Sequence, residues 1–294
     1  MRDKKFRNYV IKIYSVFLVF IVLFIMAALV VRFTDVNPIS AYLTVGIPLS
    51  LYMLLSMYLG YRGMSKYSWQ GPFYDGEKAF EKGEFAKALA FYQAALKLND
   101  EKHKLWYSYG FTLYQLKRYE EALKAYEKAL SLNNTRKDSL YKNLTARSII
   151  NELAHTYRAL GKFQKALDII MECLDWFPRD DEIFRNMALF YNDLGQYQKA
   201  IGAAEKSLQL NKRGGRAFTY QGFAYMKLGE LETAKKLLEN AIEIDPYFAR
   251  SYYNMALYYL EVNQKETALE FCEKSLQVDE NFTESKELKE MLTT

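Results

Sequence analysis

The sequence contains little glycine, proline, cysteine or histidine. Its 294 residues include 14 Gly, 5 Pro, 2 Cys and 2 His. So few glycines and prolines exclude a collagen-like or disordered chain and argue against a turn-rich all-β fold. The Cys and His residues do not form a group with the spacing of a metal site. Half of the residues are apolar and 16 % are aromatic, which is ample material for the buried core of one or two domains.

Excess positive charge is confined to the N-terminal segment. Residues 1–66 contain eight Lys or Arg and two Asp or Glu, whereas the remaining 228 residues contain 32 and 33. The net charge of +5 therefore does not belong to the C-terminal part, which is close to neutral. A nucleic-acid-binding domain needs basic side chains to contact phosphates. We therefore expect no nucleic acid among the partners of this chain.

Two long uncharged runs lie in the same N-terminal segment. Residues 13–31 and 39–61 carry no charge, and a helix of 19 residues is about 28 Å long, close to the thickness of a bilayer core. Residues 32–38 between them are polar and end in a proline. We expect two transmembrane helices joined by this short external loop. A cleaved signal peptide is the alternative, but it would have a shorter apolar run and no second span after it.

The basic residues near these runs predict their orientation. Seven Lys or Arg lie before the first run or after the second, and only Arg32 lies in the loop between them. Because positive residues favour the cytosolic side, residues 1–12, the linker 62–68 and the rest of the chain are expected in the cytosol. The sequence thus predicts an integral membrane protein with two spans and both termini inside.

Small and apolar residues recur at a fixed spacing after residue 69. Three columns share spacings of 34, 44, 34, 34 and 34 residues. They are Ala88, Ala122, Ala166, Ala200, Ala234 and Ala268; Gly76, Gly110, Ala154, Ala188, Gly222 and Ala256; and Leu96, Leu130, Leu174, Leu208, Ile242 and Leu276. The second column never holds a large side chain, which indicates that two helices approach closely there.

A further slot marks a break inside each unit. It holds Gly83, Gly161, Gly195 and Gly229 in four units, and Lys117 and Asn263 in the other two. Each unit is therefore expected to be a helix, a tight turn and a second helix. One such pair cannot bury its apolar face alone, so the units must stack into a solenoid.

The repeated unit is similar to the tetratricopeptide repeat (TPR), whose 34-residue pattern is W-x₂-L-G-x₂-Y…A-x₃-F…P. The second unit matches it well at Trp106, Tyr109, Gly110, Leu113, Ala122, Tyr126 and Ala129. The resemblance covers residues 69–282 and implies an all-α TPR solenoid. The six repeats are expected at 69–102, 103–136, 147–180, 181–214, 215–248 and 249–282.

Two segments depart from the repeat. Residues 137–146 are an insertion of ten residues, which either lengthens the next helix or forms a projecting loop. Residues 283–294 are expected to form a capping helix whose Leu288, Met291 and Leu292 cover the open face of the last repeat.

The sequence carries no motif of an enzyme or of a cofactor site. Gly161 and Lys162 lack the upstream glycine and the Ser or Thr of a phosphate-binding loop. Cys173 and Cys272 fall in apolar columns and are expected to be buried, unreactive and, three repeats apart, unpaired. We therefore expect no catalytic residue, no metal and no cofactor.

The resemblance places a binding surface on the concave side, which the first helix of each repeat lines. After the packing positions are removed, the remaining stripe of these helices is rich in Tyr, Phe and Arg, which often anchor protein interfaces. It predicts an amphipathic groove for a peptide or helix, with His155 as a solvated histidine. The candidate binding residues are Tyr107, Phe111, Tyr114, Asn151, His155, Arg158, Arg185, Asn192, Arg216, Phe223, Arg250 and Tyr253.

These patterns together predict a membrane-anchored scaffold that binds segments of partner proteins. One alternative is an envelope protein-assembly factor with its repeats on the outer side of the membrane. The other is a self-assembling homo-oligomer. For the groove itself, the alternative is that other parts of the chain cover its side chains, so that it binds no partner.

Overall fold

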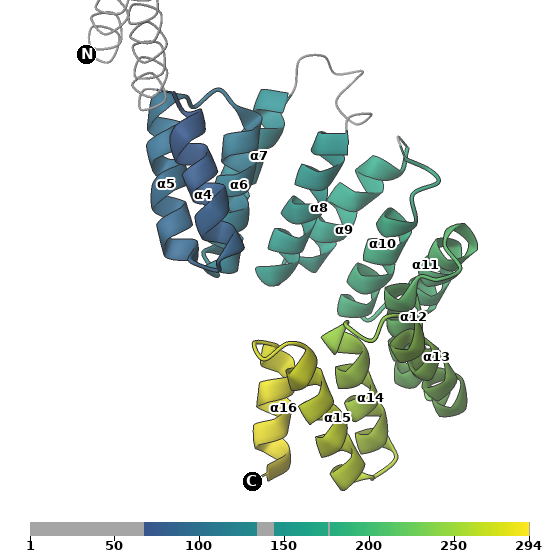
Figure 1. Cartoon of the computed structure of the whole chain (residues 1–294). Coiled ribbons are helices and arrows are strands. Elements are labelled where there is room, and N and C mark those ends of the chain that lie inside the picture. Colours follow the sequence, from purple (N-terminus) through teal and green to yellow (C-terminus); the bar gives the residue numbers. More distant parts are fainter. Residues whose placement is uncertain (1–67, 134–143, 176, 294) are drawn as a thin grey trace, which may run out of the picture. The chain divides into compact units, whose positions relative to one another are not determined.

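The computed structural model describes residues 68–133, 144–175 and 177–293 (Figure 1). This part of the chain contains thirteen α-helices and no strand. The expected all-α solenoid is therefore confirmed. The two expected membrane spans, the basic N-terminus, the loop 32–38 and residues 62–67 lie outside the described residues. Among the helices that are described, none has the length and apolarity needed to cross a bilayer.

The helices follow one another as six pairs and a final single helix. Within each pair, three residues join the first helix to the second. The pairs are α4 (Gln70–Glu81) with α5 (Phe85–Leu98), α6 (His103–Gln115) with α7 (Tyr119–Asn133), α8 (Leu144–Ala159) with α9 (Phe163–Leu174), α10 (Asp181–Asp193) with α11 (Tyr197–Leu210), α12 (Gly215–Lys227) with α13 (Leu231–Ile244), and α14 (Ala249–Glu261) with α15 (Lys265–Val278); α16 (Thr283–Thr293) follows. Even-numbered labels up to α14 thus mark the first helix of each pair.

The turns inside the pairs all use a residue with positive φ. The four glycines of this slot have φ between 70° and 83°, and Lys117 and Asn263 have φ of 59° and 58°. The turn after α4 shows the reason, since the amide of Gly83 donates to the Phe80 carbonyl and the amide of Glu84 donates to the Ala79 carbonyl, both at 2.9 Å. This pairing satisfies the last carbonyls of the helix and requires a left-handed residue.

The column of small residues lies where the two helices of a pair touch. A Cβ atom on Gly76 would lie 2.7 Å from Tyr92 Cε1, and one on Gly222 would lie 2.9 Å from Leu238 Cγ. These distances are too short for a side chain. The column therefore records close contact between helices, as the sequence predicts.

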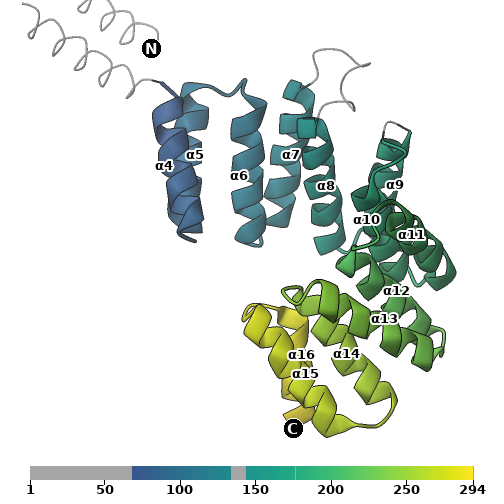
Figure 2. The same ribbon diagram turned by 45° about the vertical axis from the view of Figure 1, so that its right-hand side comes forward.

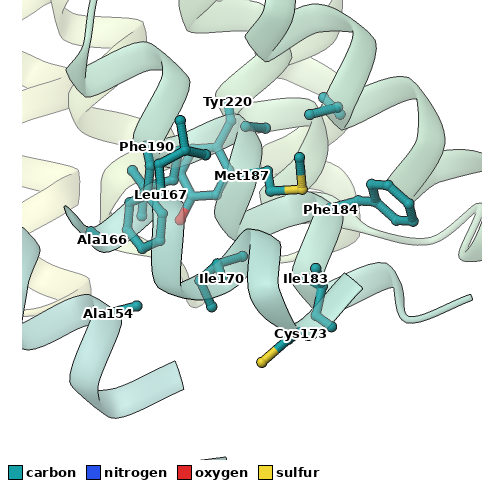
Figure 3. Close-up of a cluster of buried hydrophobic side chains, with 14 of the residues drawn as sticks. Ala154, Ala166, Leu167, Ile170, Cys173, Ile183, Phe184, Met187, Phe190 and Tyr220 are labelled. Carbon is teal, nitrogen blue, oxygen red and sulfur yellow. The ribbon is translucent and has the colours of Figure 1, made fainter. Parts of the chain in front are cut away.

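The described residues form two compact units, divided between Thr112 and Leu113 within α6. The core of the first unit contains Phe73, Ala88, Tyr92 and Leu105. The second unit contains a larger cluster, built from α8 to α12, in which Ile170, Ile183 and Phe190 are fully buried (Figure 3). Each unit therefore has its own apolar interior.

The C-terminal helix α16 closes the second unit with two of the three expected residues. Leu288 and Leu292 are buried in one cluster with Ala268 and Cys272. Met291 is 61 % exposed, so the expectation that it covers the last repeat is wrong. Leu288 and Leu292 lie four residues apart and share one side of the helix.

The insertion contributes to a helix at its C-terminal end. Helix α8 begins at Leu144, so residues 144–146 belong to it and Ala146 is fully buried. Residues 137–143 lie outside the described residues.

Candidate functional site

A cavity in the second unit is lined only by first helices and by α16. Its volume is about 450 Å³. Beside it, helix α12 packs against both α10 and α14 (Figure 2). The lining residues are Arg158 of α8; Leu189, Asn192 and Asp193 of α10; Tyr220, Phe223 and Lys227 of α12; Arg250, Tyr253, Asn254 and Leu257 of α14; and Glu284 of α16.

Five of the twelve candidate residues line this cavity. They are Arg158, Asn192, Phe223, Arg250 and Tyr253. Four successive repeats thus contribute to one hollow, as expected for the inner face of a solenoid. The other seven candidates lie elsewhere. Tyr114, Asn151, His155, Arg185 and Arg216 belong to the same unit but are not part of the lining, and Tyr107 and Phe111 belong to the first unit.

The stripe is less exposed than the sequence suggests. Of the twelve candidates Arg216 is exposed, nine are partly exposed, and Asn151 and Asn192 are buried. The row of Tyr, Phe and Arg therefore faces solvent only in part. Helix α12 contacts both α10 and α14, so side chains on this face of these three helices meet the next repeat as well as solvent.

The arginines of the stripe are paired with carboxylates. Arg158 donates to Asp193 at 2.5 and 3.1 Å, and Arg250 donates to Glu284 at 2.8 Å. In each of these pairs the acid lies one repeat further along the chain. The pairing with Asp193 raises the pKa of Arg158 against the opposing effect of burial. Such charge-assisted bonds fix the arginines in place.

The two other arginines are paired more loosely. Arg185 lies 3.4 Å from Glu182 on its own helix, and Arg216 lies 3.5 Å from Asp245. The guanidinium of Arg216 also lies 4.8 Å from the centre of the Phe248 ring. The cationic stripe is thus largely neutralised by its own protein.

The aromatic candidates also have partners. Lys227 Nζ lies 5.6 Å from the centre of the Phe223 ring, and the Tyr253 ring meets Phe282 edge-on at 5.7 Å. Burial raises the pKa of Tyr253 and of Tyr114. Cavity residues therefore offer ring faces and edges at fixed positions.

In the first unit, Tyr107 and Phe111 form a separate aromatic contact. Their rings are stacked at 6.3 Å with an interplanar angle of 12°, and Phe111 also lies 5.4 Å from Phe80.

His155 is not the solvated histidine that the sequence suggests. Its ring meets Phe190 edge-on at 5.7 Å. Burial, assisted by the positive charges of Arg158 and Arg185, lowers its pKa to about 4. His155 is therefore neutral at physiological pH.

The carboxyl of Glu152, one turn before His155, shows the opposite shift. Burial and the negative charge of Glu182 raise its pKa to about 7. Sequence reasoning did not single out Glu152. Its slot in the repeats holds Ser108, Asn186, Tyr220 and Asn254, so it carries the column's only acid.

Asn192 carries an unused acceptor in the cavity lining. Its Nδ2 donates to the Tyr220 carbonyl at 2.8 Å, but its Oδ1 is buried and has no hydrogen-bond partner within the described part of the chain. A buried polar atom without a partner costs free energy. Asn192 Oδ1 is therefore both unpaired and shielded from solvent beside the cavity.

Seven lining residues are not among the candidates. They are Leu189, Asp193, Tyr220, Lys227, Asn254, Leu257 and Glu284. A spacing signal was available for the two acids, because Asp193 follows Arg158 by 35 residues and Glu284 follows Arg250 by 34. Such separations place two residues at similar positions of adjacent repeats.

The described residues contain no group of three or more His, Cys, Asp or Glu that could hold a metal ion. Cys173 and Cys272 are buried and unpaired, as expected from their columns. Burial raises their pKa values to about 12 and about 11. Both thiols are therefore protonated and poor nucleophiles at physiological pH.

Profiles described as tetratricopeptide repeat match four stretches of the chain. They cover residues 101–178, 183–213, 215–248 and 237–270, which together make up more than half of it. No curated protein matches the chain by sequence.

Solved structures share the fold. A thermophilic TPR protein of Thermus thermophilus is 20 % identical, with a TM-score of 0.55 over 65 % of this chain and 98 % of the other. The APC/C hetero-tetramer Cut9–Hcn1 is 17 % identical, with a TM-score of 0.59 over 94 % of this chain and 53 % of the other. A tetratricopeptide repeat protein of Parabacteroides merdae is 20 % identical, with a TM-score of 0.53 over 77 % and 99 %. At these identities the likeness concerns the fold alone. The chain belongs to the tetratricopeptide-repeat family.

Proposed function

We propose that this protein is a membrane-anchored scaffold that binds a segment of a partner protein in the cavity of its first helices. TPR proteins bind protein or peptide partners, which supports the general role. The observation that carries the proposal is the cavity of about 450 Å³, to which four successive repeats contribute. Its volume is in the range of pockets that enclose small ligands or a few side chains.

The lining indicates which part of a partner would bind. Leu189, Phe223 and Leu257 provide apolar surface, and polar side chains such as Lys227 and Asn254 lie beside it. A peptide fits both, since an apolar side chain can pack against Phe223 while its backbone forms hydrogen bonds with the polar lining. Because Arg158 and Arg250 are already paired, the proposal assigns recognition to shape and hydrogen bonding more than to charge.

The N-terminal segment supplies the anchor in this proposal. Two uncharged runs and seven flanking basic residues favour two spans with the repeats in the cytosol. Anchoring would keep a bound partner at high local concentration near other membrane proteins. The proposal assigns no catalytic reaction to the chain.

Site-specific photocrosslinking in native membranes tests the proposal. A photoreactive residue at position 227 or 253 should capture one and the same partner segment, which mass spectrometry identifies. The matched control is position 74, an exposed tyrosine site in the first unit. Crosslinks that lead only to the chain's own residues would show that the cavity is covered internally, and crosslinks to a second copy would favour the homo-oligomer.

The side of the membrane needs a separate measurement. Protease added to sealed, right-side-out cells should leave the repeats intact if they are cytosolic. Cleavage of the repeats in intact cells would instead favour the envelope protein-assembly factor. Release of the full chain by alkaline carbonate would contradict the anchor itself.

A further inference from the structure

A second hollow is bordered by second helices and by other residues of α14, a helix that also lines the first cavity. It has a volume of about 700 Å³ and is bordered by α13, the turn that follows it, α14 and α15. We call it the tyrosine groove, after Tyr247, Tyr252 and Tyr259, which line it together with Phe271. No residue of the groove lines the cavity of the first helices.

Tyr247 and Phe271 of this groove are not demanded by the packing of the repeat, whereas Tyr252 and Tyr259 lie in aromatic columns that other repeats share. One and two repeats earlier, the slot of Tyr247 holds Arg213 and Arg179, and the slot of Phe271 holds Leu237 and Ala203. Tyr247 is 87 % exposed, so it contributes little to the core. A large exposed ring beside a hollow is a feature of binding surfaces.

The rings are held in place while their hydroxyls stay unused. Tyr259 and Phe271 are stacked at 5.2 Å with an interplanar angle of 20°, and Lys274 Nζ lies 4.5 Å from the centre of the Phe271 ring. Within the described part of the chain, the hydroxyls of Tyr247, Tyr252 and Tyr259 make no hydrogen bond. The groove thus combines flat apolar faces with several free donors.

One wall of the groove is acidic. Glu239 and Glu243 lie one turn apart on α13 and both line the hollow. Neither has an ion-pair partner among the described residues. Like charges four residues apart on a helix repel each other, so a bound cation would relieve this repulsion.

We propose that the tyrosine groove binds a proline-rich segment of another protein that carries arginine or lysine at one end. A polyproline II segment has free carbonyls and few N–H groups, so it needs donors such as the tyrosine hydroxyls. Its rings pack on aromatic faces, as in other proline-recognition grooves. The basic end lies against Glu239 and Glu243. The chain itself has five prolines, none of them adjacent, so it cannot supply this segment.

The test uses the full chain in a mild detergent and a fluorescent peptide of about twelve residues, two arginines followed by Pro-Pro-Ala repeats. Anisotropy should show saturable binding. A peptide with Gly-Ser-Ala repeats should bind at least about tenfold more weakly, because it lacks both the rings and the preformed helix. Replacing the two arginines by glutamates should also weaken binding, because of the acidic wall.

Three variants locate the site. Tyr247→Ala should weaken binding about tenfold, as loss of an aromatic anchor does, and it should still fold because the side chain is exposed. Glu243→Lys should weaken binding of the arginine peptide and strengthen that of the glutamate peptide. The matched control is Glu205→Lys, the slot of Glu239 one repeat earlier, which should leave binding within about twofold.

Other outcomes would overturn the proposal. Equal binding of the Gly-Ser-Ala peptide, or wild-type affinity in both groove variants, would remove the assignment. Loss of binding in Lys227→Ala would assign the peptide to the first-helix cavity instead. If Tyr247→Ala turned a dimer into a monomer in light scattering, the occupant would be a second copy of this chain. Failure here leaves the proposed function of the cavity unaffected, since the two hollows share no residue.

Discussion

Glu152 and His155 should have opposite effects on stability as the pH changes. They lie one turn apart on α8, where burial raises the pKa of Glu152 from 4.5 to about 7 and lowers that of His155 from 6.5 to about 4. The fold thus favours the neutral form of both groups. Replacing either one should reveal the pH dependence of the other.

The signs follow from proton uptake. As the pH falls from 7 to 5, Glu152 takes up a proton in the folded chain before it does so in the unfolded chain, which stabilises the fold by about 2 kcal/mol. Over the same interval His155 takes up a proton only when unfolded, which removes about 2 kcal/mol. In the wild type these contributions nearly cancel.

The variants Glu152→Gln and His155→Leu separate the two contributions. Leucine is the residue of the His155 slot at positions 189 and 257. Urea unfolding followed by circular dichroism at pH 5 and 7 should show Glu152→Gln losing about 2 kcal/mol relative to wild type on acidification, and His155→Leu gaining about as much. Other carboxylates titrate equally in all three proteins.

A direct measurement complements the unfolding data. The chain has two histidines, so a His103→Gln variant reports His155 alone in proton NMR. Its imidazole should stay neutral down to about pH 5, given a pKa of about 4. Two results together would refute the claim that the protein desolvates these groups. They are a His155 imidazole that titrates near pH 6.5, and differences in unfolding free energy between the variants and the wild type that do not change with pH.

Five further substitutions test the packing and the turns, each by its effect on the midpoint of urea unfolding. Gly222→Ala should cost about 1–3 kcal/mol, because its Cβ would lie 2.9 Å from a leucine carbon, whereas Gly202→Ala, with open space around it, should gain up to about 1 kcal/mol. Leu288→Ala should cost about 2–4 kcal/mol and Met291→Ala little, because only the former is buried. Lys117→Gly should stabilise by up to about 1 kcal/mol, because φ is 59° there; no gain would mean that the side chain compensates the strain.

The backbone of this protein was predictable because its geometry repeats. Each residue column reports one contact that recurs six times, so single departures do not hide it. Gly83 and its equivalents indicated a tight turn, and the structure shows that Lys117 and Asn263 adopt the same positive φ without being glycine. The same redundancy predicted the small column and the buried cysteines.

The candidate site was harder to predict because it depends on relations between repeats. A residue pattern shows which side of a helix faces inward but not how far the next repeat is displaced. That displacement brings Asp193 to Arg158 and Glu284 to Arg250, and it places His155 against Phe190. For the same reason, arginines that the sequence shows as free cations are paired in the folded chain.

The difference in pairing predicts how salt should act on the two hollows. In the cavity, Arg158 and Arg250 are bound to Asp193 and Glu284, so a partner gains little from charge and its affinity should change less than about twofold between 50 and 500 mM salt. In the tyrosine groove the two glutamates of α13 are unpaired within the described residues, so binding of the arginine peptide should weaken several-fold over the same range. Anisotropy titrations at several salt concentrations, with the arginine peptide and with the segment captured at position 253, measure how each affinity depends on salt. A steep salt dependence at the cavity would mean that its ion pairs open on binding, and the arginines would then contact the partner directly.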